Sequence, residues 1–333
     1  MNEASPCPPG CAIRGRFAPS PTGELHLGSL RTALVAWLSA RSAGGEFVLR
    51  VEDLDRERVR PGFSERQLAE LRALGLDWDE GPDVGGAYGP YLQTERRLRY
   101  ENALQRLVAR GLVYPCYCSR ADVAAVSAPH GAEGPRYPGT CRDLTGQQRA
   151  AKESQGRAPS LRFRVREGKV AYQDLLLGRV EQDVAGEVGD FVVRRFDGTF
   201  TYQLAVVVDD LAMQLSEVVR GADIARSTPR QLLLYEALEA PPPRFAHVPL
   251  VLGSRGDKLS KRDGAVSLEA LEREGVTARE VRAELLRQIG LPADAPSLQA
   301  LLPGFALSAV PRAPTRWDPA EFIRRRALAG AAT

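Results

Sequence analysis

Two short motifs, far apart in the sequence, carry side chains suited to binding a triphosphate. The first, PSPTGELHLGS, places His26 and Gly28 where a predicted strand leads into a predicted helix. The N-terminus of a helix presents unpaired N–H groups and a partial positive charge to an anion. His26 can hydrogen-bond a phosphoryl oxygen there, and Gly28 lets a phosphate or a flat ring approach the backbone. On its own, such a histidine is more often a helix cap.

The second motif holds half of the lysines in the protein. Only four of the 45 basic residues are lysines, and two of these four lie in Lys258-Leu259-Ser260-Lys261. A compact ammonium group differs from a guanidinium mainly where a point charge must reach a phosphate. We therefore interpret this window as a phosphate-binding loop. The alternative is a solvated surface loop that happens to contain two lysines.

The two motifs together predict a displacement at the α-phosphate of ATP. The main requirement of that reaction is neutralisation of the charge that builds up in the transition state. A carboxylate substrate is ionised at pH 7 and attacks without a general base, so no Ser-His-Asp or Cys-His arrangement is needed. The predicted products are an acyl-adenylate and pyrophosphate.

These residues resemble a known family. Phe17 to Gly23 with His26 to Ser29, and Lys258 to Arg262, are similar to the two ATP-binding motifs of class I aminoacyl-tRNA synthetases of the glutamyl type. The resemblance extends over residues 14–290 through the segments VED (51–53), YQLAVVVDD (202–210) and VRGAD (219–223). It departs from the generic motifs at Ser29, Leu259 and Arg262. It implies catalytic roles for His26, Lys258 and Lys261, and an ATP site, used with Mg²⁺, that consists of His26, Gly28, Ser29, Lys258, Leu259, Ser260 and Lys261.

The resemblance also implies a pocket for L-glutamate. Its members are Arg16, Phe17, Ala18, Pro19, Ser20, Glu52, Tyr202 and Arg220. Glu52 would pair with the α-ammonium group, and Tyr202 and Arg220 would receive the side chain. A desolvated guanidinium favours a carboxylate over the neutral amide of glutamine. As alternatives, Arg220 could form a surface ion pair and Asp53, beside Glu52, could cap the next helix.

Within this family, the chain is most similar to short paralogues that attach glutamate to queuosine in the anticodon loop of tRNA(Asp). Residues 263–333 are too few for the helical anticodon-binding domains of an ordinary glutamyl-tRNA synthetase. Two rival interpretations remain open: a truncated ordinary synthetase that charges a tRNA 3′ end, and a non-catalytic RNA-binding relative. We expect a monomer.

The cysteines indicate a metal site. Five is an odd number, so metal ligands or unpaired thiols are expected rather than a disulfide framework. Cys116-Tyr117-Cys118 followed by Tyr137 and Cys141 resembles the zinc site of the paralogues, which implies Cys116, Cys118, Tyr137 and Cys141 as ligands. Three thiolates and one oxygen donor satisfy the four-coordinate preference of zinc. The alternative is a set of buried structural thiols beside a core tyrosine.

The pattern of elements predicts an α/β fold. A strand at 14–18, a helix at 26–41 and a strand at 46–51 indicate a parallel βαβ unit. Capping boxes are predicted at Ser64/Gln67 and Thr277/Glu280, and Thr94 is predicted to cap a helix that ends at Gly111. The apolar run 204–208 is predicted to be a buried strand of the parallel sheet, ending at Asp209-Asp210.

We expect a class I synthetase Rossmann-like parallel sheet with an inserted zinc-binding α+β subdomain and a C-terminal helical segment. The expected division is a flexible leader (1–12), two halves of the catalytic domain (13–100 and 196–262), an inserted acceptor-type subdomain (101–195) and a stem-contact-like helical segment (263–333). No apolar run approaches the ~20 residues that cross a bilayer, and no secretion signal is recognisable, so we expect a cytoplasmic protein.

The net charge of +3 permits a nucleic-acid partner without demonstrating one. Arg162, Arg164 and Arg166 would share one strand face, and Arg194-Arg195 and residues 324–326 add further positive charge. Such rows can follow phosphates, but they are more often solvated faces.

Overall fold

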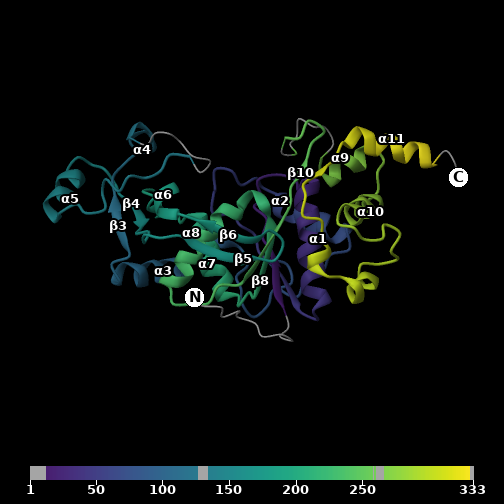
Figure 1. The fold of residues 1–333 in the computed structure, drawn as a ribbon, viewed down its shortest axis with the longest axis horizontal. Coiled ribbons are helices and arrows are strands. Elements are labelled where there is room, and N and C mark those ends of the chain that lie inside the picture. The colour runs from purple at the N-terminus through teal and green to yellow at the C-terminus, as the bar shows by residue number, and fades with distance from the viewer. Residues whose placement is uncertain (1–12, 127–133, 258, 260–265, 331–333) are drawn as a thin grey trace.

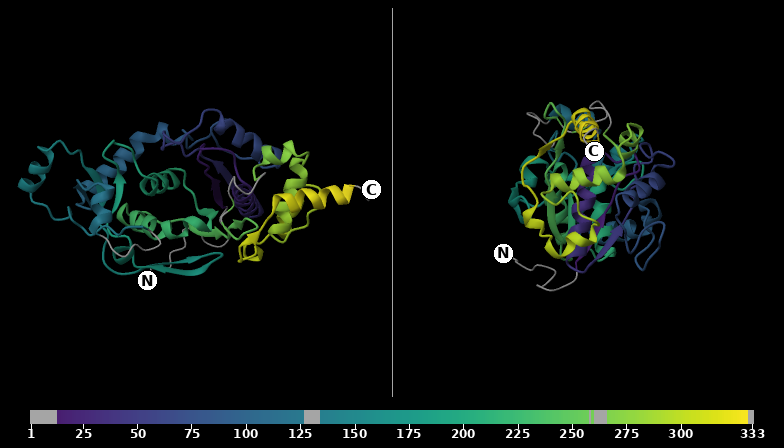
Figure 2. Two further views of the ribbon diagram at one scale, coloured as in Figure 1. Left: turned by 90° about the horizontal axis from the view of Figure 1, so that it is seen from above. Right: turned by 90° about the vertical axis from the view of Figure 1, so that its right-hand side faces the viewer.

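The structure is a computed structural model that describes residues 13–126, 134–257, 259 and 266–330. The expected leader (1–12) and the predicted site residues Lys258, Ser260 and Lys261 lie outside the described residues. The molecule is elongated (Figures 1 and 2). Parallel strands occupy its middle, a small sheet with its own helices lies at one end, and the C-terminal helices lie at the other (Figure 1).

The chain begins with the expected parallel βαβ unit. It consists of β1 (Arg14–Phe17), α1 (Leu27–Ser42) and β2 (Glu46–Leu49), with Arg14 paired to Glu46 and Phe17 to Leu49. Helix α1 is buried over most of its surface because it packs between β1 and the C-terminal part of the chain, including α10 (Ala278–Gln288). It can therefore carry apolar residues on nearly every face.

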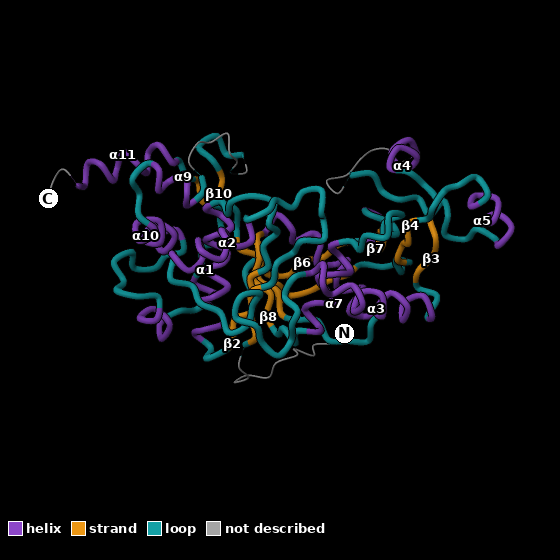
Figure 3. The backbone as a smooth tube through the Cα atoms, turned by 180° about the vertical axis from the view of Figure 1, so that it is seen from behind, coloured by secondary structure: helices purple, strands orange, loops and turns teal. Residues whose placement is uncertain are grey.

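The central strands form a mostly parallel sheet. They are β5 (Val170–Asp174), β6 (Gly178–Gln182), β8 (Glu217–Gly221) and β9 (Arg244–Val248), in the order β6-β5-β9-β8. Strand β9 is parallel to both neighbours, whereas β5 and β6 form an antiparallel hairpin. Strand β1 joins this group, because the N–H of Ser216 donates to the carbonyl of Arg14 (3.0 Å). Figure 3 shows these strands gathered in the middle of the molecule.

The predicted strand at 204–208 is wrong, because these residues lie in helix α7 (Tyr202–Ala212). A continuous apolar run of this length fits a buried strand and a buried helix equally well, so periodicity could not decide between them. Helix α7 is buried from Leu204 to Asp210 and packs against α8 (Thr228–Ala237), which follows the short 3₁₀ helix η2 (Ala222–Ser227). The helical conformation brings Asp209 and Asp210 to the buried guanidinium of Arg50.

The small sheet at one end of the molecule is antiparallel. It consists of β3 (Val113–Cys116), β4 (Ser160–Phe163) and β7 (Phe191–Arg194), reached through α3 (Arg97–Ala109). Three short helices accompany it: α4 (Arg120–Val126), α5 (Gly146–Glu153) and α6 (Val184–Glu187). After β7 the chain turns back at Asp197-Gly198 and forms a single bridge between Arg194 and Phe200, because α7 begins at Tyr202.

Two predicted helix caps are wrong. Helix α2 (Phe63–Ala73) begins after Gly62, and Gln67 donates instead to the carbonyls of Ser20 and Gly23. Thr94 lies in the 3₁₀ helix η1 (Gln93–Arg96), where Asp53 accepts hydrogen bonds from its N–H and its hydroxyl. In both cases the polar side chain has a partner that is distant in sequence, which local pattern cannot show.

The C-terminal part follows the sequence prediction closely. The capping box of Thr277 and Glu280 opens α10, as predicted. The carboxylate of Asp318 accepts from two N–H groups at the start of α11 (Pro319–Gly330). The remaining elements are α9 (Leu268–Arg273), η4 (Gln299–Gly304), η5 (Leu307–Ala309) and the parallel pair β10 (Val251–Leu252) and β11 (Thr315–Arg316). No helix in the described ranges has the length and apolar character needed to span a bilayer.

A buried ionic cluster joins α7 to β2 and η1. Asp209 accepts hydrogen bonds from Arg96 Nε (2.5 Å), Gln93 Nε2 (2.8 Å) and the hydroxyl of Tyr100 (2.9 Å). Burial, with Asp209 adding to it, raises the pKa of Tyr100 well above its usual value. Because both Asp209 and Arg96 are shielded from water, each depends on the other for its charge to be tolerated.

The change Asp209→Asn should therefore lower the free energy of unfolding by about 3 kcal/mol, because it leaves Arg96 buried without its counter-charge. Urea unfolding measures the difference. Asp143→Asn is the control: its carboxylate is exposed and pairs with Arg164, so its unfolding should resemble that of the parent. Equal losses for the two variants would contradict the importance of the buried cluster.

Candidate functional site

A cavity of about 540 Å³ opens where β1, α1, α7 and β8 meet. Every predicted glutamate-pocket residue lines it, and so do three of the predicted ATP-site residues. These are Arg16, Phe17, Ala18, Pro19, Ser20, Glu52, Tyr202 and Arg220 for the first group, and His26, Gly28 and Ser29 for the second. The structure thus brings the two predicted groups to one cavity.

His26 is the N-cap of α1, the role that such a histidine more often has. Its Nδ1 accepts a hydrogen bond from the N–H of Ser29 (3.1 Å). A backbone N–H can only donate, so a neutral imidazole carries its proton on Nε2, as donation to a phosphoryl oxygen would require. Capping and phosphate binding are therefore compatible. A Cβ on Gly28 would lie 3.1 Å from Nδ1 of His26, so this glycine makes room for the imidazole itself.

Helix α2 holds the loop of the first motif from behind. Gln67, almost fully buried, donates to the carbonyls of Ser20 (3.1 Å) and Gly23 (2.7 Å). One turn further, Glu70 accepts from the N–H of Leu25 (3.3 Å). Burial raises the pKa of Glu70 to about 7, although the hydrogen bond from Leu25 works in the opposite direction. No local sequence pattern marks Gln67 and Glu70 as supports of the motif, because both partners lie more than 40 residues away.

The described residues around the second motif are anchored beside the first. Leu259, between the lysines in sequence, is 3% exposed, and its N–H points to the carbonyl of Val251 (3.4 Å). After the segment outside the described residues, the carbonyl of Val266 accepts from the N–H of Leu27 (2.9 Å). Ser267 donates to the carboxylate of Glu24 (2.6 Å). Leu259, Val266 and Ser267 therefore lie in the same region of the fold as the first motif.

The far end of the cavity is lined by buried charged groups. Arg16 donates to the carbonyl of Val219 (3.2 Å), and its Nε lies 3.8 Å from the carboxylate of Asp210. Burial lowers the pKa of Arg16, outweighing the opposing effect of Asp210. Glu52 accepts from Arg50 Nη2 (3.0 Å), and burial raises the pKa of its carboxyl group.

Arg220 is also buried at this end. Its side chain is 4% exposed, so the interpretation of this arginine as a surface ion-pair residue is wrong.

The charges of this cluster do not cancel. Among the described residues, the guanidinium groups of Arg16, Arg50, Arg96 and Arg220 gather with the carboxylates of Glu52, Asp209 and Asp210, while the buried carboxylate of Asp174 is separated from Arg220 by His247. Within the gathered group one positive charge remains, which is opposite in sign to the net charge of an acidic amino acid at neutral pH. Arg50 was not predicted as a site residue, although the pair Asp209-Asp210 after a buried apolar run is a signal that buried cations lie nearby.

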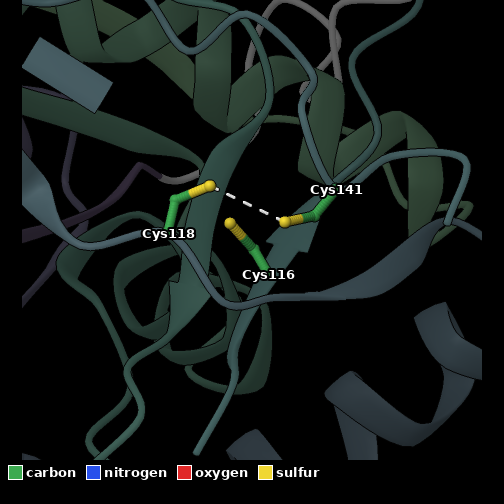
Figure 4. A group of neighbouring side chains, drawn as sticks. All are labelled: Cys116, Cys118 and Cys141. Carbon is green, nitrogen blue, oxygen red and sulfur yellow. Dashed lines mark hydrogen bonds between the residues drawn. The ribbon is translucent and has the colours of Figure 1, made fainter. Parts of the chain in front are cut away.

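The four predicted zinc ligands lie together in the small sheet. The sulfur atoms of Cys116, Cys118 and Cys141 are all within 4.8 Å of one another, and those of Cys118 and Cys141 are 3.6 Å apart (Figure 4). The hydroxyl of Tyr137 lies 3.3 Å from the sulfur of Cys116 and accepts from the N–H of Cys141 (2.8 Å). Such a group of soft donors could hold a metal ion.

Arg162 lies over this cluster rather than on an open face. Its guanidinium carbon is 3.7 Å from the centre of the Tyr137 ring, and Arg164 stacks similarly over Tyr114 (4.7 Å). Arg166 pairs with Glu236 (3.2 Å). The row of three arginines is therefore committed to contacts within the protein, and Arg162 supplies a positive charge beside the thiols. Arg194, Arg195, Arg325 and Arg326 also have carboxylate partners.

A family model, curated proteins and solved structures that match this chain all belong to the tRNA synthetases. Residues 12–300 match the family model of the catalytic domain of class I tRNA synthetases (E and Q). The glutamyl-Q tRNA(Asp) synthetase of Symbiobacterium thermophilum is 54% identical over 93% of this chain and 97% of that protein. The protein of the same name from Nitratidesulfovibrio vulgaris is 48% identical, over 91% and 90% respectively. A crystal structure of glutamate-tRNA synthetase from Elizabethkingia anophelis has a TM-score of 0.83 and 29% identity, and the match covers 95% of this chain and 70% of that one.

The raised pKa of Glu70 predicts a pH dependence of stability. Between its usual value of 4.5 and about 7, the folded protein binds more protons at Glu70 than the unfolded chain does, so stability falls as the pH rises through this range. Glu70→Gln keeps an acceptor for Leu25 and removes the buried charge. It should be more stable than the parent by about 1 kcal/mol at pH 8, after allowance for solvent screening.

At pH 5 this difference should shrink, which urea unfolding at the two pH values measures. Glu65→Gln, a substitution on the exposed side of the same helix, is the control and should follow the parent at both pH values. A constant difference between Glu70→Gln and the parent would contradict the assigned shift.

Proposed function

This chain belongs to the class I tRNA synthetases of the E and Q group, and on that basis we propose that it is a glutamyl-Q tRNA(Asp) synthetase. It activates L-glutamate with ATP and transfers the glutamyl group to queuosine in tRNA(Asp). The observation that carries the proposal is the single cavity in which a helix N-terminus with His26 meets the buried, cationic end with Arg220.

Activation requires the two ends of the cavity to hold two different substrates. In the proposed arrangement, Glu52 receives the α-ammonium group of glutamate, and Arg220 with Tyr202 receives the side-chain carboxylate. An oxygen of the α-carboxylate then attacks the α-phosphorus of ATP, and the bond to the β-phosphate breaks. The products are glutamyl-adenylate and pyrophosphate, and no proton needs to be removed from the attacking group.

The N-terminus of α1 is the proposed phosphate site. His26 would donate from Nε2 to a phosphoryl oxygen, and the N–H of Gly28 in the first turn would support it. Lys258 and Lys261 would neutralise charge on the phosphates during the displacement, accompanied by Mg²⁺. This proposed role of the two lysines is supported by their neighbours Leu259 and Val266, which pack beside the first motif.

Transfer uses a hydroxyl of queuosine as the nucleophile. It attacks the carbonyl carbon of the adenylate, AMP leaves, and the hydroxyl proton is lost. Sequence identity favours this acceptor over a tRNA 3′ end, because this chain is 54% and 48% identical to the two glutamyl-Q tRNA(Asp) synthetases and 46% identical to a glutamate–tRNA ligase of Acidithiobacillus ferrooxidans. The buried Arg16, Glu52 and Arg220 speak against a non-catalytic relative, which has no need for them.

We propose that the cysteine cluster holds one structural zinc ion. Cys116, Cys118 and Cys141 would supply thiolates, and Tyr137 would supply an oxygen. The fit is supported by the 4.8 Å limit on the distances between the sulfurs and by Arg162, whose charge offsets the excess negative charge of such a site. Zinc would fix the loops between β3 and β4, which have little apolar core of their own.

The domain division at 1–12, 13–100, 101–195, 196–262 and 263–333 is proposed as the arrangement that serves this reaction. The catalytic halves surround the cavity, and the segment 101–195 contains the cysteine cluster. We propose a monomer acting in the cytoplasm, where its tRNA substrate is found.

Incubation with ATP, radiolabelled glutamate and queuosine-containing tRNA(Asp) tests the function. After nuclease digestion, the label should appear on the queuosine nucleoside and not on the 3′-terminal adenosine. Label on the terminal adenosine would instead identify an ordinary glutamyl-tRNA synthetase, and failure to label any RNA would favour the non-catalytic alternative. In the same assay, Lys261→Ala should reduce transfer by orders of magnitude, whereas Lys152→Ala, a lysine on α5, should not.

Elemental analysis tests the metal site. The purified protein should contain about one zinc ion per chain, and Cys141→Ser should lower this content markedly, because a serine oxygen is a poorer zinc ligand than a thiolate. Tyr137→Phe should lower zinc affinity if its oxygen is the fourth ligand, as competition with a chelator would show. A metal-free parent protein that folds normally would leave the cluster as structural thiols.

A further inference from the structure

Arg220 has all but one of its N–H groups bonded to the protein. A guanidinium has five N–H donors. Nε donates to His247 Nε2 (3.0 Å), and Nη2 donates both to Thr228 Oγ1 (2.7 Å) and to Gln231 Oε1 (2.8 Å). Nη1 donates to the hydroxyl oxygen of Tyr202 (3.2 Å). One N–H therefore remains, on Nη1, beside a hydroxyl that lines the same cavity.

None of these four partners carries a negative charge. Two are hydroxyls, one is an amide, and one is an imidazole nitrogen that accepts a hydrogen bond. The carboxylates of Glu52 and Asp210 at this end of the cavity pair with Arg50. Within the described ranges, no ion pair joins Arg220 to a carboxylate. A buried cation whose direct partners are all neutral is suited to receive an anion from outside the protein.

Asp174 fixes the protonation pattern of His247. Its Oδ1 accepts from the N–H groups of Leu176 (2.9 Å), Leu177 (2.8 Å) and His247 (3.2 Å), and its Oδ2 contacts His247 Nδ1 at 2.5 Å. A carboxylate accepts hydrogen bonds, so the proton lies on Nδ1 and the lone pair of Nε2 faces Arg220. Burial lowers the pKa of His247, and so does Arg220, although Asp174 acts in the opposite direction. Because Nε2 accepts the hydrogen bond from Arg220, the imidazole is neutral.

We propose that Asp174 and His247 are positioning residues for glutamate selection, which rests on the proposed function. Asp174 keeps Nε2 of His247 in the accepting form, and Nε2 accepts from Nε of Arg220. This contact fixes the orientation of the guanidinium. Its last N–H and the hydroxyl of Tyr202 then point to the position of the substrate side chain. Neither Asp174 nor His247 touches the substrate, since neither lines the cavity.

This arrangement distinguishes glutamate from glutamine. The oxygen of Tyr202 already accepts from Arg220, so its own proton is available to donate. The side chain of the substrate therefore meets two donors, the last N–H of Arg220 and the hydroxyl of Tyr202. A carboxylate provides an acceptor for each of them. The amide of glutamine provides one acceptor, and its NH₂ group would face a donor, which leaves polar hydrogens unpaired in a buried site.

The change Asp174→Asn tests the tautomer. The oxygen of asparagine can keep the backbone bonds made by Oδ1, so its NH₂ group then faces His247 and requires an acceptor at Nδ1. The imidazole proton would move to Nε2, where it opposes the N–H of Arg220 Nε. In glutamate-dependent pyrophosphate exchange, KM for glutamate should rise about tenfold or more, while KM for ATP stays within about twofold of the parent.

A matched pair of substitutions at His247 separates positioning from packing. His247→Gln can place an oxygen near the position of Nε2 and keep an acceptor for Arg220. His247→Asn keeps a donor for Asp174 but has no atom that reaches Arg220. KM for glutamate should rise at least about tenfold in His247→Asn and should stay within about threefold of the parent value in His247→Gln. The preference for glutamate over glutamine should fall only in His247→Asn.

Thermal unfolding of each variant and a control substitution complete the test. Asp190→Asn removes another buried carboxylate, in the small sheet, and should leave KM for glutamate unchanged. Equal KM values for glutamate in folded His247→Asn and His247→Gln would overturn the proposal. Parallel increases of KM for glutamate and KM for ATP in a variant would overturn it too. If Asp174→Asn does not fold, the His247 pair decides. Exchange by the parent that depends on an amino acid other than glutamate would instead overturn the proposed function.

Discussion

The buried guanidinium groups impose the strongest constraint on this structure. A cation away from water needs a counter-charge or a complete set of acceptors, and the fold provides these in different ways for different arginines. Arg50 and Arg96 are neutralised by Asp209 and Asp210 of α7. Arg220 is surrounded by neutral acceptors instead. Because Arg220 has no carboxylate partner among the described residues, positive charge remains at one end of the cavity. An acidic substrate could neutralise it there.

The same constraint explains why the cavity is built from distant parts of the chain. Arg16 comes from β1, Arg220 from β8, Tyr202 from α7 and Glu52 from the end of β2. Parallel strands place their carboxyl ends at one edge of a sheet, so charged residues there can meet without crossing the core. Helix α1 starts at this edge and turns its N-terminus, with His26 as cap, towards the cavity. In the proposed function, the buried cation and the helix dipole would therefore bind the two anionic substrates from opposite ends of the cavity.

The cysteine cluster follows similar physics at the far end of the molecule. Three sulfurs and a tyrosine hydroxyl gather between β3 and the loop at Cys141, and the guanidinium of Arg162 covers the Tyr137 ring. Gly189 allows this packing, because a Cβ at that position would lie 2.2 Å from the carbonyl oxygen of Tyr137, and its φ of +73° suits glycine. An arginine that looked like a phosphate contact in the sequence is thus part of the support of the cluster.

The sequence alone determined the features that depend on local chemistry. These include the βαβ unit, the capping box at Thr277, the grouping of His26 and Arg220 at one cavity, and the clustering of Cys116, Cys118 and Cys141. Tertiary structure decided the rest. Leu204 to Val208 became a helix, Gln67 became a support for the first motif, and His247 with Asp174 became the setting of Arg220. Periodicity and spacing describe neighbours along the chain, whereas the partner of a buried polar group is set by which distant segment the fold brings within hydrogen-bonding distance.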